Sequence, residues 1–169
     1  QHYSSHRRPL TGYLDWCKLL YGTCEQQADM VADTARTDFL QQMVARHCPG
    51  CRVLEIGVGS GVLLAFAARA GVASMDGVEA VPEALDMAQE TLRRNGLSEK
   101  VRLHSCLAEQ FEPEEVSGTA TWDVIISESV GLMGFCEWMV MSVLVARRWL
   151  APGGCFLPAQ ISLHACPVR

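Results

Sequence analysis

The chain lacks any apolar run long enough to span a membrane, and it lacks internal repeats and low-complexity tracts. It also lacks an excess of basic residues, because 14 Lys and Arg stand against 19 Asp and Glu, for a net charge of −5. We therefore expect neither a membrane nor nucleic acid as a partner, while a cationic substrate is compatible with this charge. The 169 residues, 49% of them hydrophobic, are enough for one domain with a buried core.

The eight cysteines lack the spacing of a metal site. Cys48 and Cys51 form one C-x-x-C pair, but the second pair that a zinc ribbon needs is absent. The pair also precedes an expected strand, whereas a reactive thiolate is stabilised at the start of a helix. We therefore expect no metal and reduced thiols, in a protein of the cytoplasm or nucleus.

A short apolar run followed by alternating glycines is the centre of the sequence pattern. Residues 53–56 are typical of a strand buried on both faces. Gly57, Gly59 and Gly61 follow, and a helical pattern then covers 62–70. Glycines allow a sharp turn and let a ligand approach the backbone closely. The stretch predicts a ligand-binding unit of strand, turn and helix.

The spacing of these glycines separates two kinds of nucleotide site. A dinucleotide fingerprint requires G-x-G-x-x-G, and Val62 stands at its last position, which disfavours a nicotinamide oxidoreductase. Glu79 ends the next apolar stretch, where a carboxylate can accept hydrogen bonds from both ribose hydroxyls. Together, the glycine turn and this acid resemble the S-adenosylmethionine site of the class I methyltransferases.

Strand and helix patterns alternate along the chain, which predicts an α/β fold with a doubly wound, mostly parallel, Rossmann-like sheet behind an N-terminal helical segment. The expected strands are 53–56, 74–79, 101–105, 122–127, 155–157 and 161–169, and the expected helices are 25–47, 62–70, 80–95 and 136–150. The segment before residue 25 is either a lid over the ligand or a peripheral packing element. Because ligands bind at the carboxyl ends of such strands, we expect the glycine turn and the residues after Ser127 to converge.

Two acids surround the loop after the expected strand at 122–127. Glu128 stands at the strand end, and Glu137 stands at the start of the next helix, where the helix dipole favours a carboxylate. Gly131 and Gly134 lie between them, so a hairpin-like loop would bring both acids to one pocket.

Strand end, glycine loop and second acid together resemble the double-E loop of the protein arginine methyltransferases. Residues 29–37, 66–71, 95–97 and 150–154 resemble further motifs of that family. The resemblance covers roughly residues 25–168 and implies a class I methyltransferase fold. It also implies S-adenosylmethionine as cofactor and arginine in a protein as substrate.

The resemblance implies a role for each matched residue. Arg36 would hold the carboxylate of the cofactor, Glu79 the ribose and Glu109 the adenine. Glu128 and Glu137 would clamp the substrate guanidinium, whose flat fork of donors matches two carboxylates. The other residues expected at the cofactor are Glu55, Gly57, Gly59, Gly61, Ala80, Ala108 and Met139.

The same resemblance divides the chain into a helical segment 1–48, a cofactor-binding domain 49–158 and, at 159–169, the start of a C-terminal β-barrel. A homodimer or hetero-oligomer of the full-length protein is expected. Two alternatives stay open. Ser129 and Leu132 replace aromatic residues of the family and favour a weak or inactive regulatory subunit. A small-molecule methyltransferase of the same fold is disfavoured by the double-E loop.

Overall fold

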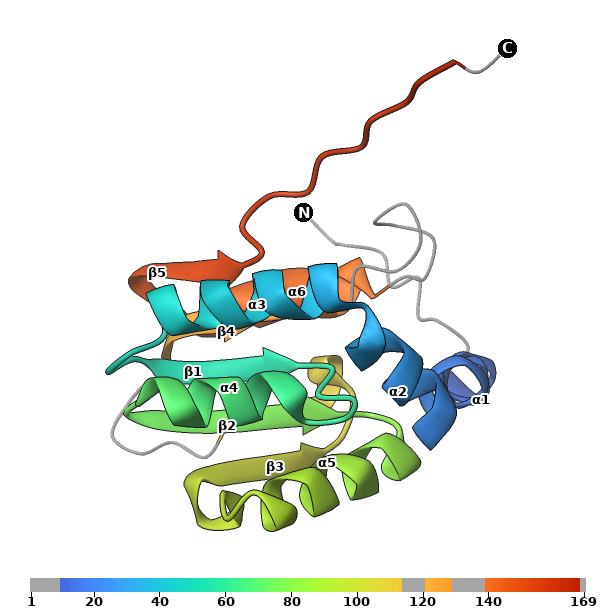
Figure 1. Ribbon diagram of the computed structural model, residues 1–169, viewed down its shortest axis with the longest axis horizontal. Coiled ribbons are helices and arrows are strands. Elements are labelled where there is room, and N and C mark those ends of the chain that lie inside the picture. Colours follow the sequence, from blue (N-terminus) through green and yellow to red (C-terminus); the bar gives the residue numbers. More distant parts are fainter. Residues whose placement is uncertain (1–9, 114–120, 129–138, 168–169) are drawn as a thin grey trace, which may run out of the picture.

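A five-stranded parallel sheet lies at the centre of the structure, a computed structural model that describes residues 10–113, 121–128 and 139–167. The strands are β1 (Arg52–Ile56), β2 (Ser74–Glu79), β3 (Val101–Ser105), β4 (Trp122–Ile126) and β5 (Leu150–Leu157). Their order is β3-β2-β1-β4-β5 (Figure 1). From β1 the chain adds β2 and β3 on one side and then β4 and β5 on the other, so the strand order reverses between β1 and β4. This arrangement confirms the predicted doubly wound fold and puts the ligand-binding edge beside the ends of β1 and β4.

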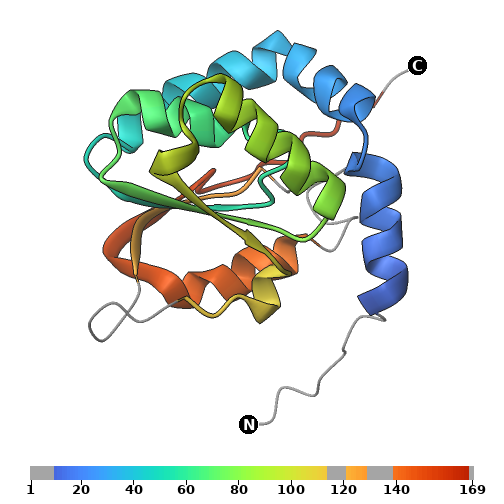
Figure 2. The ribbon, with the colours of Figure 1, turned by 90° about the horizontal axis from the view of Figure 1, so that it is seen from below.

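Helices cover both faces of the sheet (Figure 2). On one face lie α3 (Thr34–His47), α4 (Val62–Ala70) and α5 (Pro82–Arg94), and on the other lies α6 (Val140–Ala146). The helices α1 (Leu10–Tyr21) and α2 (Cys24–Ala32) lie past the carboxyl ends of the strands, and short 3-10 turns cover Ser98–Lys100, Ala108–Gln110 and Arg147–Trp149. No helix in these parts of the chain is long and apolar enough to cross a membrane.

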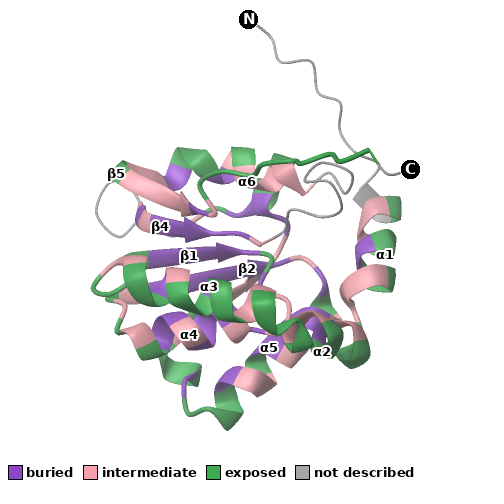
Figure 3. Ribbon diagram, turned by 45° about the horizontal axis from the view of Figure 1, so that its top comes forward, coloured by how far each residue is buried: buried purple, intermediate pink, exposed green. Residues whose placement is uncertain are grey.

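The central strand β1 is buried on both faces, as its apolar run predicts (Figure 3). Val53 packs into the core shared with α3 and α4, and it is fully buried. Leu54 belongs to the second core on the opposite face, with the aromatic rings of Phe111 and Trp149. These two cores fix β1 in place and thereby the start of the glycine turn.

The helix expected at 25–47 is instead two helices, α2 and α3, which meet at Asp33. The Asp33 carboxylate accepts a hydrogen bond from the backbone N–H of Arg36 at 3.1 Å and so caps the start of α3. The apolar period runs on through the break, so periodicity alone did not locate it. The break matters because it sets the direction of Arg36.

The C-terminal part differs from expectation in three ways. The strand expected at 155–157 begins at Leu150, and α6 ends at Ala146, so Pro152 lies inside β5 with a shifted register on β4. Leu150 pairs with Trp122 and Cys155 pairs with Val124, so residues 151–154 form an irregularity in the strand, where Gly153 has a φ of 80°. The strand expected at 161–169 does not form in its described part, 161–167, which extends away from the sheet (Figure 1) without a strand partner.

Candidate functional site

A cavity of about 690 Å³ opens at the carboxyl ends of the central strands. The glycine turn, α1, α2, α3 and the segment after β3 line it, and Glu128 lines it from the end of β4. Its volume lies within the roughly 300–1,000 Å³ typical of small-molecule and cofactor sites. The convergence expected between the glycine turn and the residues after Ser127 is therefore present for Glu128.

Glycine is needed at the three positions of the turn for two different structural reasons. Gly57 and Gly59 line the cavity at φ of 78° and 54°, left-handed conformations that favour glycine. Gly61, at φ 79°, is not among the cavity-lining residues. A Cβ on Gly61 would stand 3.1 Å from the Cα of Ala88, so this glycine allows α5 to approach the start of α4.

Glu79 is buried at the end of β2 and lines the cavity. Its two carboxylate oxygens accept the backbone N–H groups of Gly59, at 2.9 Å, and Val81, at 2.8 Å. Burial raises the pKa of Glu79, and these backbone hydrogen bonds oppose the rise. Because each oxygen keeps a second lone pair, the carboxylate is held ready to accept hydroxyl donors from a ligand.

Glu55 lies beneath the turn and is almost completely buried in the cavity wall. Burial, and secondly the nearby charge of Glu79, raise the pKa of Glu55 well above its usual value. Its Oε2 has no hydrogen-bond partner among the described residues. A buried polar atom without a partner is costly, so a ligand that brings a donor to this wall is favoured. This orphaned oxygen and the Glu79 carboxylate fit a cofactor with amino and hydroxyl groups.

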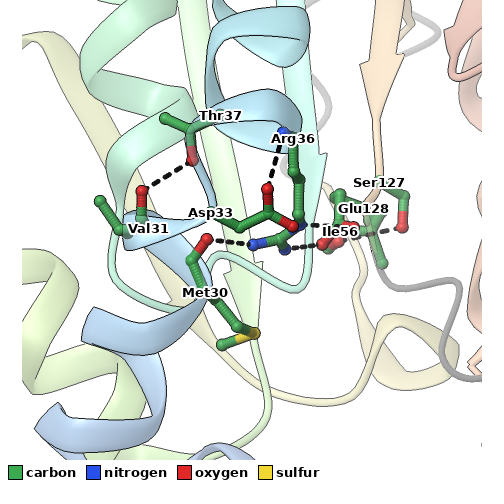
Figure 4. A network of polar contacts seen from close by, with 8 residues as sticks. All are labelled: Met30, Val31, Asp33, Arg36, Thr37, Ile56, Ser127 and Glu128. Atoms are coloured by element: carbon green, nitrogen blue, oxygen red, sulfur yellow. Dashed lines mark hydrogen bonds and ion pairs between the residues drawn. The ribbon is translucent and has the colours of Figure 1, made fainter.

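The structure joins Arg36 to Glu128, two residues expected to serve different ligands (Figure 4). The Nε of Arg36 donates to Oε1 of Glu128 at 2.9 Å, and its Nη2 donates to Oε2. Its Nη1 donates to the carbonyl of Met30 at 2.9 Å. The side chains of Arg36 and Glu128 are 29% and 28% exposed, so water screens this pair less than a surface ion pair.

Neighbouring hydrogen bonds fix the backbone on both sides of this pair (Figure 4). The Thr37 hydroxyl donates to the carbonyl of Val31 at 3.0 Å and closes the junction of α2 and α3. The Ser127 hydroxyl donates to the carbonyl of Ile56 at 3.1 Å and joins the end of β4 to β1.

The remaining expected residues divide into three groups. Ala80, Ala108 and Met139 line the cavity. Glu109 is exposed beside it and accepts a hydrogen bond from the Ser142 hydroxyl at 3.3 Å. Glu137, like Ser129 and Leu132, lies in 129–138, outside the described residues.

Helices α1 and α2 supply one wall of the cavity, and for α1 this agrees with the expected alternative of a segment that lies over the ligand. Tyr13, Cys17 and Tyr21 of α1 line it, so the N-terminal segment is a part of the site and not only peripheral packing. Gln27 of α2 is buried there, and its Nε2 donates to the carbonyl of Tyr21 at 2.9 Å. Its Oε1 stands 2.8 Å from where a Cβ on Gly59 would be. Sequence reasoning missed Gln27, although one signal was available, because Gln27 is a polar residue on the apolar face of the helical pattern.

The two thiols of the C-x-x-C pair differ in exposure, because Cys48 is buried and Cys51 is partly exposed. Cys48 is fully buried, and this burial raises its pKa to about 12, so the thiol is protonated at neutral pH. No disulfide joins the cysteines of the described part of the chain, and no metal-holding cluster of His, Cys, Asp or Glu occurs among those residues.

Comparison with known proteins places these features in a family. Residues 53–154 match the family model described as a methyltransferase domain. The matched range begins with β1, contains the glycine turn, Glu79 and Glu128, and covers more than half of the chain. The chain therefore belongs to the methyltransferase domain family.

The relatives that align with the chain define the resemblance more closely. A probable protein arginine N-methyltransferase 6 of Arabidopsis thaliana is 39% identical over 145 residues, which are 83% of this chain and 32% of the relative. Protein arginine N-methyltransferase 6 of Xenopus laevis is 35% identical over 154 residues, 88% of this chain and 43% of the relative. These relatives confirm the resemblance to arginine methyltransferases, and the chain spans less than half of their length.

A solved structure agrees with these relatives. Arabidopsis thaliana protein arginine methyltransferase 10, solved in an open conformation, superimposes with a TM-score of 0.74 at 34% identity over 81% of this chain and 39% of that one.

Proposed function

We propose that the protein transfers a methyl group from S-adenosylmethionine to the guanidinium of arginine in protein substrates. One observation carries the proposal: the Glu128 carboxylate holds a guanidinium through two contacts, at the edge of a cavity with a methyltransferase glycine turn. That guanidinium belongs to Arg36, and the same chemistry suits a substrate arginine. The names of the aligned relatives support this substrate class.

The cofactor, when bound, supplies a methyl group on a positively charged sulfur. Glu79 would accept its ribose hydroxyls, because the bonds from Gly59 and Val81 leave acceptor capacity on both carboxylate oxygens. The unpartnered Oε2 of Glu55 would accept an N–H donor. Arg36 would bind the carboxylate of the cofactor. The acidic side chains of the cavity favour a ligand with positive charge.

The substrate guanidinium would be held by Glu128 together with Glu137, as the sequence resemblance implies. Two carboxylates fix the plane of the guanidinium and aim one terminal nitrogen at the methyl group. They also draw positive charge toward the other nitrogens, which leaves the aimed nitrogen more nucleophilic. Positioning and electrostatics would therefore supply most of the rate enhancement.

The test is the exchange of either carboxylate for its amide in the full-length protein. Glu128→Gln and Glu137→Gln should each lower arginine methylation by at least about 10²-fold while sparing cofactor binding, because a tilted guanidinium misplaces its nitrogen. The double variant should lose far less than the product of the single losses, since the two acids act as a unit.

Asp123→Asn is the matched control for these variants. Asp123 holds Arg52 with the same two-point geometry at the amino end of β1, away from the cavity. Its exchange should leave the methylation rate unchanged. Near-normal methylation by Glu128→Gln would contradict the proposal. A parallel loss of cofactor affinity would mean that Glu128 supports the cofactor pocket instead.

We further propose that the full-length protein acts as an oligomer, in the cytoplasm or nucleus. A second solved structure supports the assembly: a Trypanosoma brucei PRMT1 enzyme–prozyme heterotetramer with AdoHcy, which superimposes with a TM-score of 0.72 at 27% identity over 80% of this chain and 42% of that one. Light scattering on the full-length protein tests the assembly. Cofactor binding without methylation of any arginine peptide would instead favour the regulatory subunit that Ser129 and Leu132 suggest.

A further inference from the structure

In this structure Arg36 occupies the carboxylate that Glu128 would offer to a substrate arginine. We propose that this pair is an autoinhibitory contact, and that the cofactor carboxylate releases it by drawing Arg36 away from Glu128. Cofactor binding would then open the arginine site. The inference rests on the proposed function, because it assigns Arg36 and Glu128 to the two ligands of that reaction.

The geometry of the pair is that of substrate recognition. Nε and Nη2 of Arg36 each contact one oxygen of Glu128, the two-point fork by which a carboxylate binds a guanidinium. A second guanidinium cannot use the same edge of Glu128 while Arg36 holds it. Both side chains are more than two thirds buried, so the contact persists at ionic strengths that screen a surface pair.

The charges of the cavity explain why the cofactor carboxylate would compete for Arg36. Among the described residues that line the cavity, Arg36 is the only lysine or arginine. The ionisable acids in that lining are Asp29, Asp33, Glu55, Glu79 and Glu128. Among these described side chains, a ligand carboxylate that enters the cavity therefore finds its cation in Arg36.

The backbone around Arg36 lets the side chain change partners without movement of α3. Asp33 caps the Arg36 backbone N–H at 3.1 Å, and Thr37 bonds to the carbonyl of Val31 at 3.0 Å. The guanidinium alone has to turn from one carboxylate to the other. Since coupling between two binding sites is reciprocal, substrate should also tighten cofactor binding.

The experiment measures the affinity of the full-length protein for a glycine-rich peptide with a single arginine, by fluorescence anisotropy. S-adenosylhomocysteine at saturation should raise this affinity at least about 5-fold, a coupling of ordinary size for two linked sites. S-adenosyl-3-thiopropylamine, which is the same ligand without its carboxylate, should leave the affinity unchanged at saturation. A peptide with lysine in place of arginine reports binding that does not involve the guanidinium.

Arg36→Gln removes the guanidinium that occupies Glu128, and this variant provides the second part of the peptide-binding experiment. This variant should bind the arginine peptide more tightly than the wild type without cofactor, and S-adenosylhomocysteine should no longer raise its affinity. Arg52→Gln is the matched control, because it breaks a two-point pair with Asp123 at the far end of β1 and should leave the coupling intact. Arg36→Lys, which keeps the charge without the fork, replaces Arg36→Gln if circular dichroism shows that the latter is unfolded.

Two results would overturn the inference while the proposed function stands. One is equal affinity of the wild type for the arginine peptide with and without S-adenosylhomocysteine. The other is weaker cofactor-free binding by a folded Arg36→Gln, which would mean that Arg36 positions Glu128 and does not block it. Failure of the arginine peptide to bind better than the lysine peptide under every condition would remove the proposed function and this inference together.

Discussion

Exchange of Glu79 for glutamine separates two roles of this carboxylate, which are to support the glycine turn and to bind the ribose of the cofactor. One oxygen accepts the Gly59 N–H and the other accepts the Val81 N–H. Glutamine keeps the shape but turns one of these acceptors into an NH₂ group, which faces a backbone donor. One buried N–H therefore loses its partner, and one acceptor for a ribose hydroxyl disappears.

The magnitudes follow from these two losses. An unsatisfied buried donor costs about 1–3 kcal/mol, so the free energy of unfolding should fall by roughly that amount. A hydrogen bond from a ligand to a charged acceptor contributes about 1.5–3 kcal/mol. The affinity for S-adenosylhomocysteine should therefore fall about 10- to 100-fold, because 1.4 kcal/mol corresponds to a factor of ten.

Calorimetry with two ligands isolates the ribose contribution. Glu79→Gln should weaken S-adenosylhomocysteine much more than its analogue without the 2′ and 3′ hydroxyls. Asp86→Asn, which changes an exposed acid on α5, is the control for the loss of a negative charge and should weaken neither ligand. Equal weakening of both ligands by Glu79→Gln would refute the ribose assignment and leave Glu79 only the support of the glycine turn.

Two further predictions concern stability. Gly61→Ala should lower the free energy of unfolding, measured in urea, more than Gly96→Ala. Both glycines have positive φ, so an alanine at either position costs about 1–2 kcal/mol of backbone strain. Only the Cβ at position 61 would also contact Ala88. Equal losses would contradict the close approach of α5. Burial tends to raise the pKa of Asp76, but hydrogen bonds from neighbouring imidazole, guanidinium and indole groups lower it overall. The stability from this lowered pKa is present above the unfolded-state value of about 3.9 and is lost as pH falls through the folded-state value. The stability advantage of the wild type over Asp76→Asn should therefore shrink between pH 7 and pH 3; a constant difference would contradict this account.

The sheet and the glycine turn were predictable because their signals are local. The buried run at 53–56 and the glycines after it specify a strand and a turn without reference to distant residues. Glu79 was predictable for the same reason, as an acid at a strand end. The family resemblance then supplied Arg36 and Glu128 as candidates, each for a different ligand.

The contact between Arg36 and Glu128 was not predictable from local patterns. The two residues are 92 positions apart, and their meeting depends on the break at Asp33 and on the reversal of strand order between β1 and β4. Gln27 was missed for a similar reason, because its place above Gly59 follows from how α2 crosses the turn. Residue propensities and periodicity predict single helices and strands, whereas these contacts arise from the way in which separate helices and strands pack together.

The most direct test of the central claim is the identity of the methylated product. The full-length protein is incubated with S-adenosylmethionine that carries a tritium-labelled methyl group and with the single-arginine peptide, and the peptide is then hydrolysed for amino-acid analysis. The account predicts label in methylarginine, none from the matched lysine peptide, and a loss of at least about 10²-fold with Glu128→Gln. Label in another amino acid, or no label although S-adenosylhomocysteine binds, would contradict it.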